Sequence, residues 1–126
     1  MTRVLALFAV LLAATAPLLA QQTPPAAPPT TQVLATLTVN AGVDRAAIMK
    51  VMPDEVRDTV KLYLDGKIQQ WYSRSDGRGV VFILNTTSAA DAKVLMEALP
   101  LAKAHLVTFD YMPLAPLGPL RMLLQP

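Results

Sequence analysis

The stretch from Gly66 to Asn85 constrains the fold of this chain most strongly. It contains two strand-like runs, Lys67–Arg74 and Val80–Asn85, joined by the short segment Ser75-Asp76-Gly77-Arg78-Gly79. Two such runs separated by a few residues that include glycine are typical of a β-hairpin, because glycine supplies the positive φ that tight turns need. The sequence therefore predicts a hairpin in the middle of the domain.

A strand and a helix are predicted before the hairpin. Val33–Asn40 is rich in β-branched residues and predicts a strand, and Asp44 is a candidate N-cap for the helix that follows. Pro53 predicts a kink or a restart of this helix, because proline lacks an amide donor and clashes one turn back. The helix is expected to end at Gly66 and to bury one apolar face, made by Val56, Val60, Tyr63 and Leu64.

A second helix and a last strand are predicted after the hairpin. Ser88 and Asp91 have capping-box spacing, and Pro100 is expected to stop the helix. Its expected buried face comprises Val94, Leu95, Ala98 and Leu99, and the last strand is expected over Ala104–Met112. The order β-α-β-β-α-β predicts an α+β fold of the ferredoxin-like type, with helices on one face of a four-stranded antiparallel sheet.

The predicted sheet is apolar on both faces. Val80–Leu84 does not alternate between apolar and polar residues, and the last strand has apolar residues at both odd and even positions. A sheet with one face in water should alternate, and the helices cover only one face. A second copy of the sheet is the simplest cover for the other face, so the pattern predicts a homodimer with a barrel-like interior.

The N-terminus has the layout of a secretory signal peptide. Residues 1–20 contain Arg3, an apolar run and a small residue, Ala20, after which cleavage is expected. This predicts a periplasmic or secreted protein that meets the membrane only during export. An uncleaved anchor is the alternative, although Pro17 interrupts a stretch already near the minimum for a span.

The remaining chain divides into three parts. Residues 21–31 contain four prolines among Ala, Thr and Gln, and predict a disordered linker. Residues 32–119 form the predicted domain, and residues 120–126 form a C-terminal tail.

Composition excludes several classes of function. Loss of Arg3 with the signal peptide leaves 10 Lys and Arg (11 − 1) against 9 Asp and Glu, a net charge of +1. These charges are scattered and no motif reads RNA or DNA, so we expect no nucleic-acid partner. The absence of cysteine excludes disulfides and thiolate chemistry. A single histidine with scattered carboxylates gives no metal-ligand spacing, so no metal and no cofactor are expected.

Several short motifs, in this order, resemble a known family. They are Met52-Pro53-Asp54-Glu55-Val56, Gly66-Lys67 leading to Trp71, and Ala98-Leu99-Pro100-Leu101 followed by a strand and Met112-Pro113-Leu114. Together they resemble the muconolactone Δ-isomerase-like branch of the dimeric α/β-barrel proteins, from Val33 to Pro119. The resemblance implies two ferredoxin-like protomers paired into a barrel and, in the enzyme, a double-bond shift in an unsaturated lactone.

The last strand offers two candidate proton-transfer groups. His105 is the only histidine, and its usual pKa near neutrality suits a pocket base. The alternative is a surface histidine at the end of a strand. Asp110 is expected to point to the opposite face of the strand from His105, and it is either an exposed charge or a buried proton-transfer group.

The hairpin and the first helix offer four candidate ligand-binding residues. If Trp71 points into the barrel, Tyr72 points towards the helices, because side chains alternate along a strand. Trp71 could then stack on a flat ligand, and Arg74 could bind a carboxylate or pair with Asp76. Tyr63 lies on the apolar helix face, with its hydroxyl at the rim of the core. For each of these residues, ordinary packing or solvation is the alternative.

Two functions remain open when the residues and the resemblance are taken together. We expect an exported homodimer that binds a small apolar or aromatic-derived molecule in the barrel. The alternative is a cofactor-independent isomerase that shifts a double bond in an unsaturated lactone by acid–base proton transfer.

Overall fold

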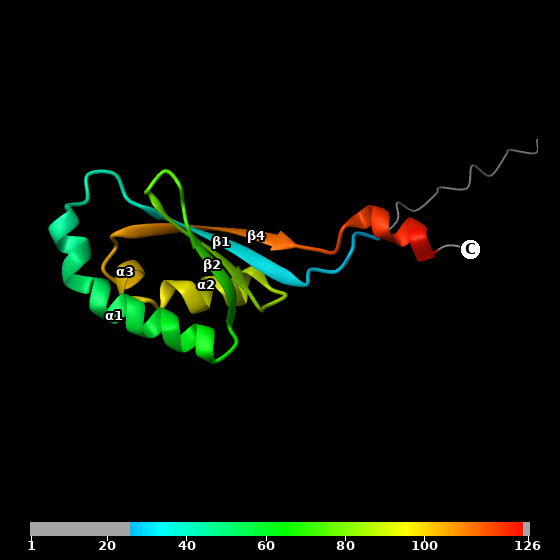
Figure 1. Cartoon of the computed structure of the whole chain (residues 1–126), viewed down its shortest axis with the longest axis horizontal. Coiled ribbons are helices and arrows are strands. Elements are labelled where there is room, and N and C mark those ends of the chain that lie inside the picture. The colour runs from blue at the N-terminus through cyan, green and yellow to red at the C-terminus, as the bar shows by residue number, and fades with distance from the viewer. Residues whose placement is uncertain (1–25, 125–126) are drawn as a thin grey trace, which may run out of the picture.

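The computed structural model of the chain describes residues 26–124, and its elements follow the predicted order (Figure 1). They are β1 (Gln32–Val39), α1 (Arg45–Leu64), β2 (Ile68–Ser73), β3 (Gly79–Leu84), α2 (Ala89–Glu97), α3 (Pro100–Lys103), β4 (Val107–Leu114) and the 3-10 helix η1 (Gly118–Leu124). The four strands form one antiparallel sheet in the order β2-β3-β1-β4. This confirms the predicted ferredoxin-like α+β fold.

The hairpin forms as predicted. The Arg74 amide donates to the Gly79 carbonyl oxygen across 2.9 Å, and Gly77 takes a φ of 69° in the loop. Strand β2 pairs with β3 from Ile68 to Ser73, with an irregularity between Ile68 and Gln70. The loop therefore uses its first glycine for the left-handed conformation that other residues avoid.

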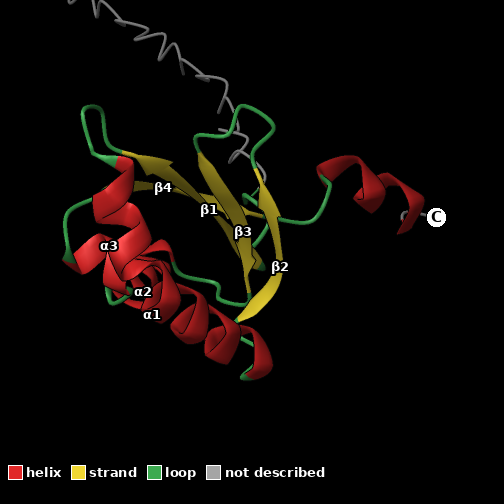
Figure 2. Cartoon of the chain, turned by 60° about the vertical axis from the view of Figure 1, so that its left-hand side comes forward, coloured by secondary structure: helices red, strands yellow, loops and turns green. Residues whose placement is uncertain are grey.

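All three α-helices lie on one face of the sheet (Figure 2). The core between the two layers contains Val33, Ala35 and Leu37 of β1, Phe82 and Leu84 of β3, and Ala92 and Met96 of α2. Alternate residues of β1 enter this core, as expected for a strand with one covered face.

Helix α1 differs from its prediction in two ways. It runs through Pro53 without a restart, because the proline ring lies on the exposed side of the helix, where water can replace the lost hydrogen bond. Its predicted buried face is exposed: 52% of Val56, 40% of Val60, 46% of Tyr63 and 76% of Leu64 is accessible to solvent. The helix is thus not packed tightly onto the sheet along this face.

The second half of the domain also needs corrections. Ala92 and Met96 form the buried face of α2. Of the residues predicted for that face, Leu99 is buried and Leu95 half-buried, whereas Ala98 is exposed and Val94 is 75% exposed. Pro100 does stop α2, but it also begins the short helix α3, where a proline at the first position loses no hydrogen bond. The last strand begins at Val107 rather than Ala104, because His105 has a φ of 56° and belongs to a turn. Both predicted N-caps form: Asp44 accepts from the Ala46 amide and Ser88 from the Asp91 amide.

The other face of the sheet, here called the open face, has no helix over it. Leu34, Val81 and Ile83 are half-buried there, and Met112 is 59% exposed. Segment Gly118–Leu124 extends away from the domain in both views and exposes apolar side chains (Figures 1 and 2).

The predicted signal peptide and most of the predicted linker lie outside the described residues. Within residues 26–124, none of the helices combines the length and the apolar character needed to cross a membrane.

Candidate functional site

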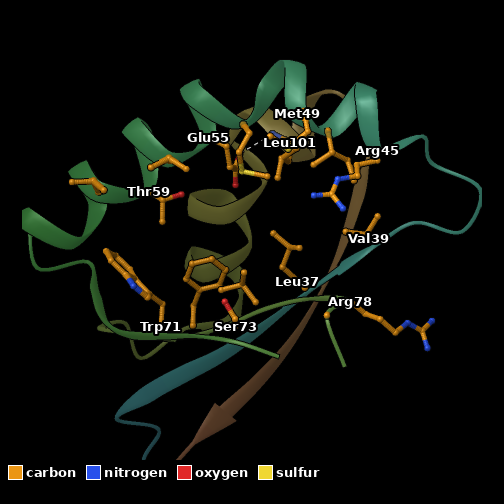
Figure 3. Close-up of a pocket in the computed structure, with 18 of the residues that line it drawn as sticks. Leu37, Val39, Arg45, Met49, Glu55, Thr59, Trp71, Ser73, Arg78 and Leu101 are labelled. Carbon is orange, nitrogen blue, oxygen red and sulfur yellow. Dashed lines mark hydrogen bonds between the residues drawn. The ribbon is translucent and has the colours of Figure 1, made fainter. Parts of the chain in front are cut away.

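A cavity of about 860 Å³ lies between α1 and the sheet (Figure 3). Its volume falls within the range of about 300–1,000 Å³ that is usual for small-molecule sites. Its roof consists of apolar α1 side chains, and its floor of the helix-facing side chains of β1 and β3. The roof residues are Ile48, Met49, Met52, Val56 and Val60, and the floor residues are Leu37, Val39, Val80 and Phe82. The exposed face of α1 thus borders a cavity.

The end of the cavity near β2 is aromatic. Trp71 points from β2 into the cavity, and the Tyr63 ring packs against the Trp71 ring with their centroids 4.5 Å apart, at a tilt of 54°. Trp71 is the only tryptophan of the chain. Tilted aromatic pairs at this distance are favourable, so Tyr63 fixes the ring that walls this end.

Glu55 places a carboxylate in the roof of the cavity. The side chain is only 6% exposed, and its Oε2 accepts a hydrogen bond of 2.8 Å from the Leu101 amide at the start of α3. Burial raises the pKa of this carboxyl above its usual range, and the nearby Asp58 charge adds to the rise, while the Leu101 hydrogen bond opposes it. The other oxygen points down into the cavity (Figure 3). Such a group can hold or release a proton closer to neutral pH than an exposed glutamate can.

Three further polar side chains border the same space. Thr59 points from α1 and Ser73 from β2 towards the interior, and Arg45 lies at the mouth near the start of α1 (Figure 3). A largely apolar cavity with a few polar groups placed around it has the form of a ligand-binding site.

The structure brings together two of the five sequence-predicted site residues, Trp71 and Tyr63. The expected orientation of these two side chains is reversed: Trp71 faces the helices rather than the barrel side. Tyr72 lies on the open face, where it is 58% exposed and donates to the Gln70 side chain across 3.2 Å. Arg74 lies on the open face as well, bonded to the Thr38 hydroxyl at 2.8 Å and paired with Asp76 at 2.5 Å. The ion pair with Asp76 was the alternative to ligand binding in the sequence analysis, and it is present in the structure.

The two candidates near the last strand lie outside the cavity. His105 is exposed in the turn before β4, and its carbonyl oxygen accepts from the Asn40 side chain at 2.9 Å. Asp110 is exposed on the open face, opposite Thr36 in the register of β4 with β1. Neither side chain faces the cavity beside Trp71 and Glu55.

The sequence reasoning missed Glu55, which the structure makes the most distinctive group of the site. A helix that restarts at Pro53 would have Glu55 in its first turn, where a carboxylate favours the positive end of the helix dipole. In an unbroken helix Glu55 instead shares a face with Met52 and Thr59, three and four positions away. That spacing, a lone carboxylate within an apolar helix face, was the available signal.

The part of the chain that the structure describes contains no cluster of three or more histidine, aspartate or glutamate side chains that could hold a metal ion. No protein-family model matches the chain, and neither does any curated protein.

Among solved structures, the chain is similar to 5-chloro-2-hydroxyhydroquinone dehydrochlorinase from Burkholderia phenoliruptrix AC1100, solved in complex with 2,5-dihydroxybenzoquinone. The match has a TM-score of 0.50 and 17% sequence identity, and it covers 66% of this chain and 92% of the other. At this identity the match establishes a shared ferredoxin-like fold.

Proposed function

We propose that this protein binds a small, largely apolar molecule in the cavity between α1 and the sheet. This position differs from the expectation drawn from the sequence, which put the ligand in the barrel on the open side of the sheet. The observation that carries the proposal is the cavity itself, with an apolar roof and floor, one aromatic wall and a buried carboxylate. Folding favours the filling of such spaces by protein side chains, because interiors pack densely. A helix that leaves an apolar face accessible to solvent gives up stability, and binding of a ligand explains why it does so.

The solved structure with the same fold supports a ring-shaped ligand. That enzyme was captured with 2,5-dihydroxybenzoquinone, a flat six-membered ring with oxygen substituents. Trp71 offers a flat apolar wall, and Glu55, Thr59 and Ser73 offer hydrogen-bonding groups for such substituents. We therefore propose an aromatic-derived molecule as the ligand class, in agreement with the resemblance to muconolactone Δ-isomerase-like proteins.

Fluorescence of Trp71 tests this proposal directly, because the chain has no other tryptophan. Titration with a panel of ring compounds should change the emission saturably for at least one of them. Val60→Arg fills the cavity from α1 and should abolish the change, whereas Val94→Arg, on an exposed site of α2 outside the cavity, should not. An unchanged emission across the panel, or equal binding by the Val60 variant, would contradict the proposal.

A second candidate function, proton transfer at an unsaturated carbonyl compound, is favoured by Glu55. A double-bond shift needs a group that takes a proton from one carbon and returns it to another, and a carboxyl of raised pKa suits both steps. Unsaturated lactones, the substrate class implied by the sequence resemblance, are the compounds to examine. In heavy water, the protein should exchange the acidic C–H protons of such a lactone, and Glu55→Gln should stop the exchange without preventing binding.

We also propose that the protein is an exported homodimer. The half-buried apolar residues of the open face support self-association, because helices cover only the opposite face of the sheet. Export rests on the sequence of the first twenty residues, and a secreted chain that begins at Gln21 would support it.

A further inference from the structure

The mouth of the cavity carries a cation with no partner among the described residues. Arg45 is the first residue of α1 and borders the cavity. Its guanidinium group turns towards Val39 and the space beneath the helix (Figure 3). Within residues 26–124 it makes neither an ion pair nor a side-chain hydrogen bond, so its donors remain available to a ligand.

Two other arginines of the domain are engaged in ion pairs: Arg57 pairs with Asp54 at 2.6 Å and Arg74 with Asp76 at 2.5 Å. Arg78 also borders the cavity, but its side chain turns away from it (Figure 3). The carboxylate next to Arg45 in sequence, that of Asp44, accepts from the Ala46 amide at 3.1 Å as the cap of α1. Arg45 is thus the arginine positioned to meet an anion in the cavity.

The cavity is long as well as apolar. Arg45 and Glu55 are ten positions apart in α1, which corresponds to about 15 Å along a helix axis. Trp71 lies beyond Glu55, next to Tyr63 near the other end of the helix. A single ring against Trp71 cannot also reach Arg45, so a ligand that uses both must be elongated.

We propose that the ligand is an elongated carboxylate, with its carboxylate at Arg45 and its apolar body along α1 towards Trp71. This inference rests on the proposed function and adds the charge, length and orientation of the ligand. A guanidinium group binds a carboxylate through two parallel hydrogen bonds, which makes arginine the natural partner for this group.

The surroundings of Glu55 support this orientation. A second carboxylate beside this buried group would meet a like charge in a poorly solvated place. The apolar body of the ligand, by contrast, would contact Met52 and Val56 on α1 and Phe82 on β3. The opposite orientation would leave Arg45 unpaired and would place the carboxylate against an aromatic ring.

The experiment compares 6-phenylhexanoate with 6-phenylhexan-1-ol by titration of Trp71 fluorescence. The alcohol has the same length and is the more apolar compound, so hydrophobic contact alone favours the alcohol. We expect the acid to bind about tenfold more tightly than the alcohol, and benzoate to bind more weakly than 6-phenylhexanoate. Arg45→Ala should remove the preference for the acid, and Arg45→Lys should restore part of it.

Arg57→Ala is the matched control, because it removes the same charge from an exposed site of α1 outside the cavity. It should leave the preference for the acid unchanged. Equal binding of acid and alcohol, or a preference that survives Arg45→Ala, overturns the inference while the proposed function stands. Benzoate that binds as tightly as 6-phenylhexanoate overturns the length argument. If neither phenylhexyl compound binds and the ring panel also fails, the proposed function fails with it.

Discussion

At the scale of single residues, Glu55 combines a structural and a chemical role. Its carboxylate accepts a hydrogen bond from the Leu101 amide at the start of α3. The N-cap residue of α3, Leu99, has no side chain that could accept this hydrogen bond in its place. The same carboxyl borders the cavity and has a raised pKa. One side chain therefore joins α1 to α3 and equips the cavity with a proton donor or acceptor.

The raised pKa of Glu55 predicts a pH-dependent stability. Between the usual pKa of 4.5 and the raised value, the folded protein binds this proton more tightly than the unfolded chain does. The contribution of Glu55 to stability is therefore fully present below pH 4.5 and is lost as the pH rises through the raised pKa. Glu55→Gln keeps an acceptor for the Leu101 amide and does not titrate.

Denaturant unfolding of both proteins from pH 4 to pH 8 measures this effect. Relative to the wild type, the free energy of unfolding of Glu55→Gln should rise with pH across the window. Parallel curves for the two proteins would show that Glu55 does not titrate there.

Sequence reasoning succeeded at residues governed by local rules. The N-caps Asp44 and Ser88 and the Arg74–Asp76 pair depend on neighbours within three positions, which a sequence displays. It missed the burial of Glu55 and wrongly included His105 in the last strand. The surroundings of Glu55 depend on α3, 46 positions away, and the His105 carbonyl oxygen in the turn accepts from Asn40, which directly follows β1. Arg45 was passed over because only the folded chain shows that it lacks a partner.

At the scale of elements, the central pair of strands depends on the absence of a side chain at Gly79. A Cβ atom there would overlap the backbone carbonyl oxygen of Leu37 on β1, which cannot move without disturbing the ladder. Gly79 therefore permits the close approach at the start of β3.

Gly79→Ala should lower the free energy of unfolding by about 1–3 kcal/mol, because overpacking forces the backbone to shift. Gly118→Ala is the matched control, since an added Cβ there meets no atom within 4 Å. It should change stability by less than about 0.5 kcal/mol. Denaturant unfolding measures the free energy of unfolding of the two variants. Equal values for Gly79→Ala and Gly118→Ala would refute the steric argument.

Element order was predictable from the sequence, whereas the packing of α1 was not. The periodicity of Val56, Val60, Tyr63 and Leu64 identified one helix face, and apolar periodicity usually marks a core. The same pattern arises when a face borders a ligand cavity, because both environments select apolar side chains. The periodicity of apolar residues cannot distinguish a helix face in a packed core from one that borders a cavity.

At the scale of the whole molecule, the sheet separates two surfaces of different character. The helix side contains the core and the cavity, whereas the open face combines half-buried apolar residues with exposed polar ones. The prediction of a homodimer from the apolar pattern of Val80–Leu84 remains a prediction, and the open face is where it can be tested.

Val81→Lys places a charge at the middle of the open face, on a strand flanked by β2 and β1. We expect the wild type to be a dimer by light scattering after size exclusion, and the variant to be a monomer that keeps its ligand affinity, because buried unpaired charges oppose association. Val94→Lys, on the exposed surface of α2, should remain dimeric. A wild type that is monomeric at high concentration would refute self-association through this face.

The irregular pairing between Ile68 and Gln70 decides which side chains of β2 serve which surface. Ile68 is buried in the core and Trp71 faces the cavity, although they are three positions apart and regular alternation would send them to opposite faces. One extra residue in β2 thus reverses which side chains of the strand point to which face. Without it, Tyr72 would face the cavity and the sole tryptophan would lie on the open face. The character of the cavity wall therefore depends on the number of residues in β2 as much as on their chemistry.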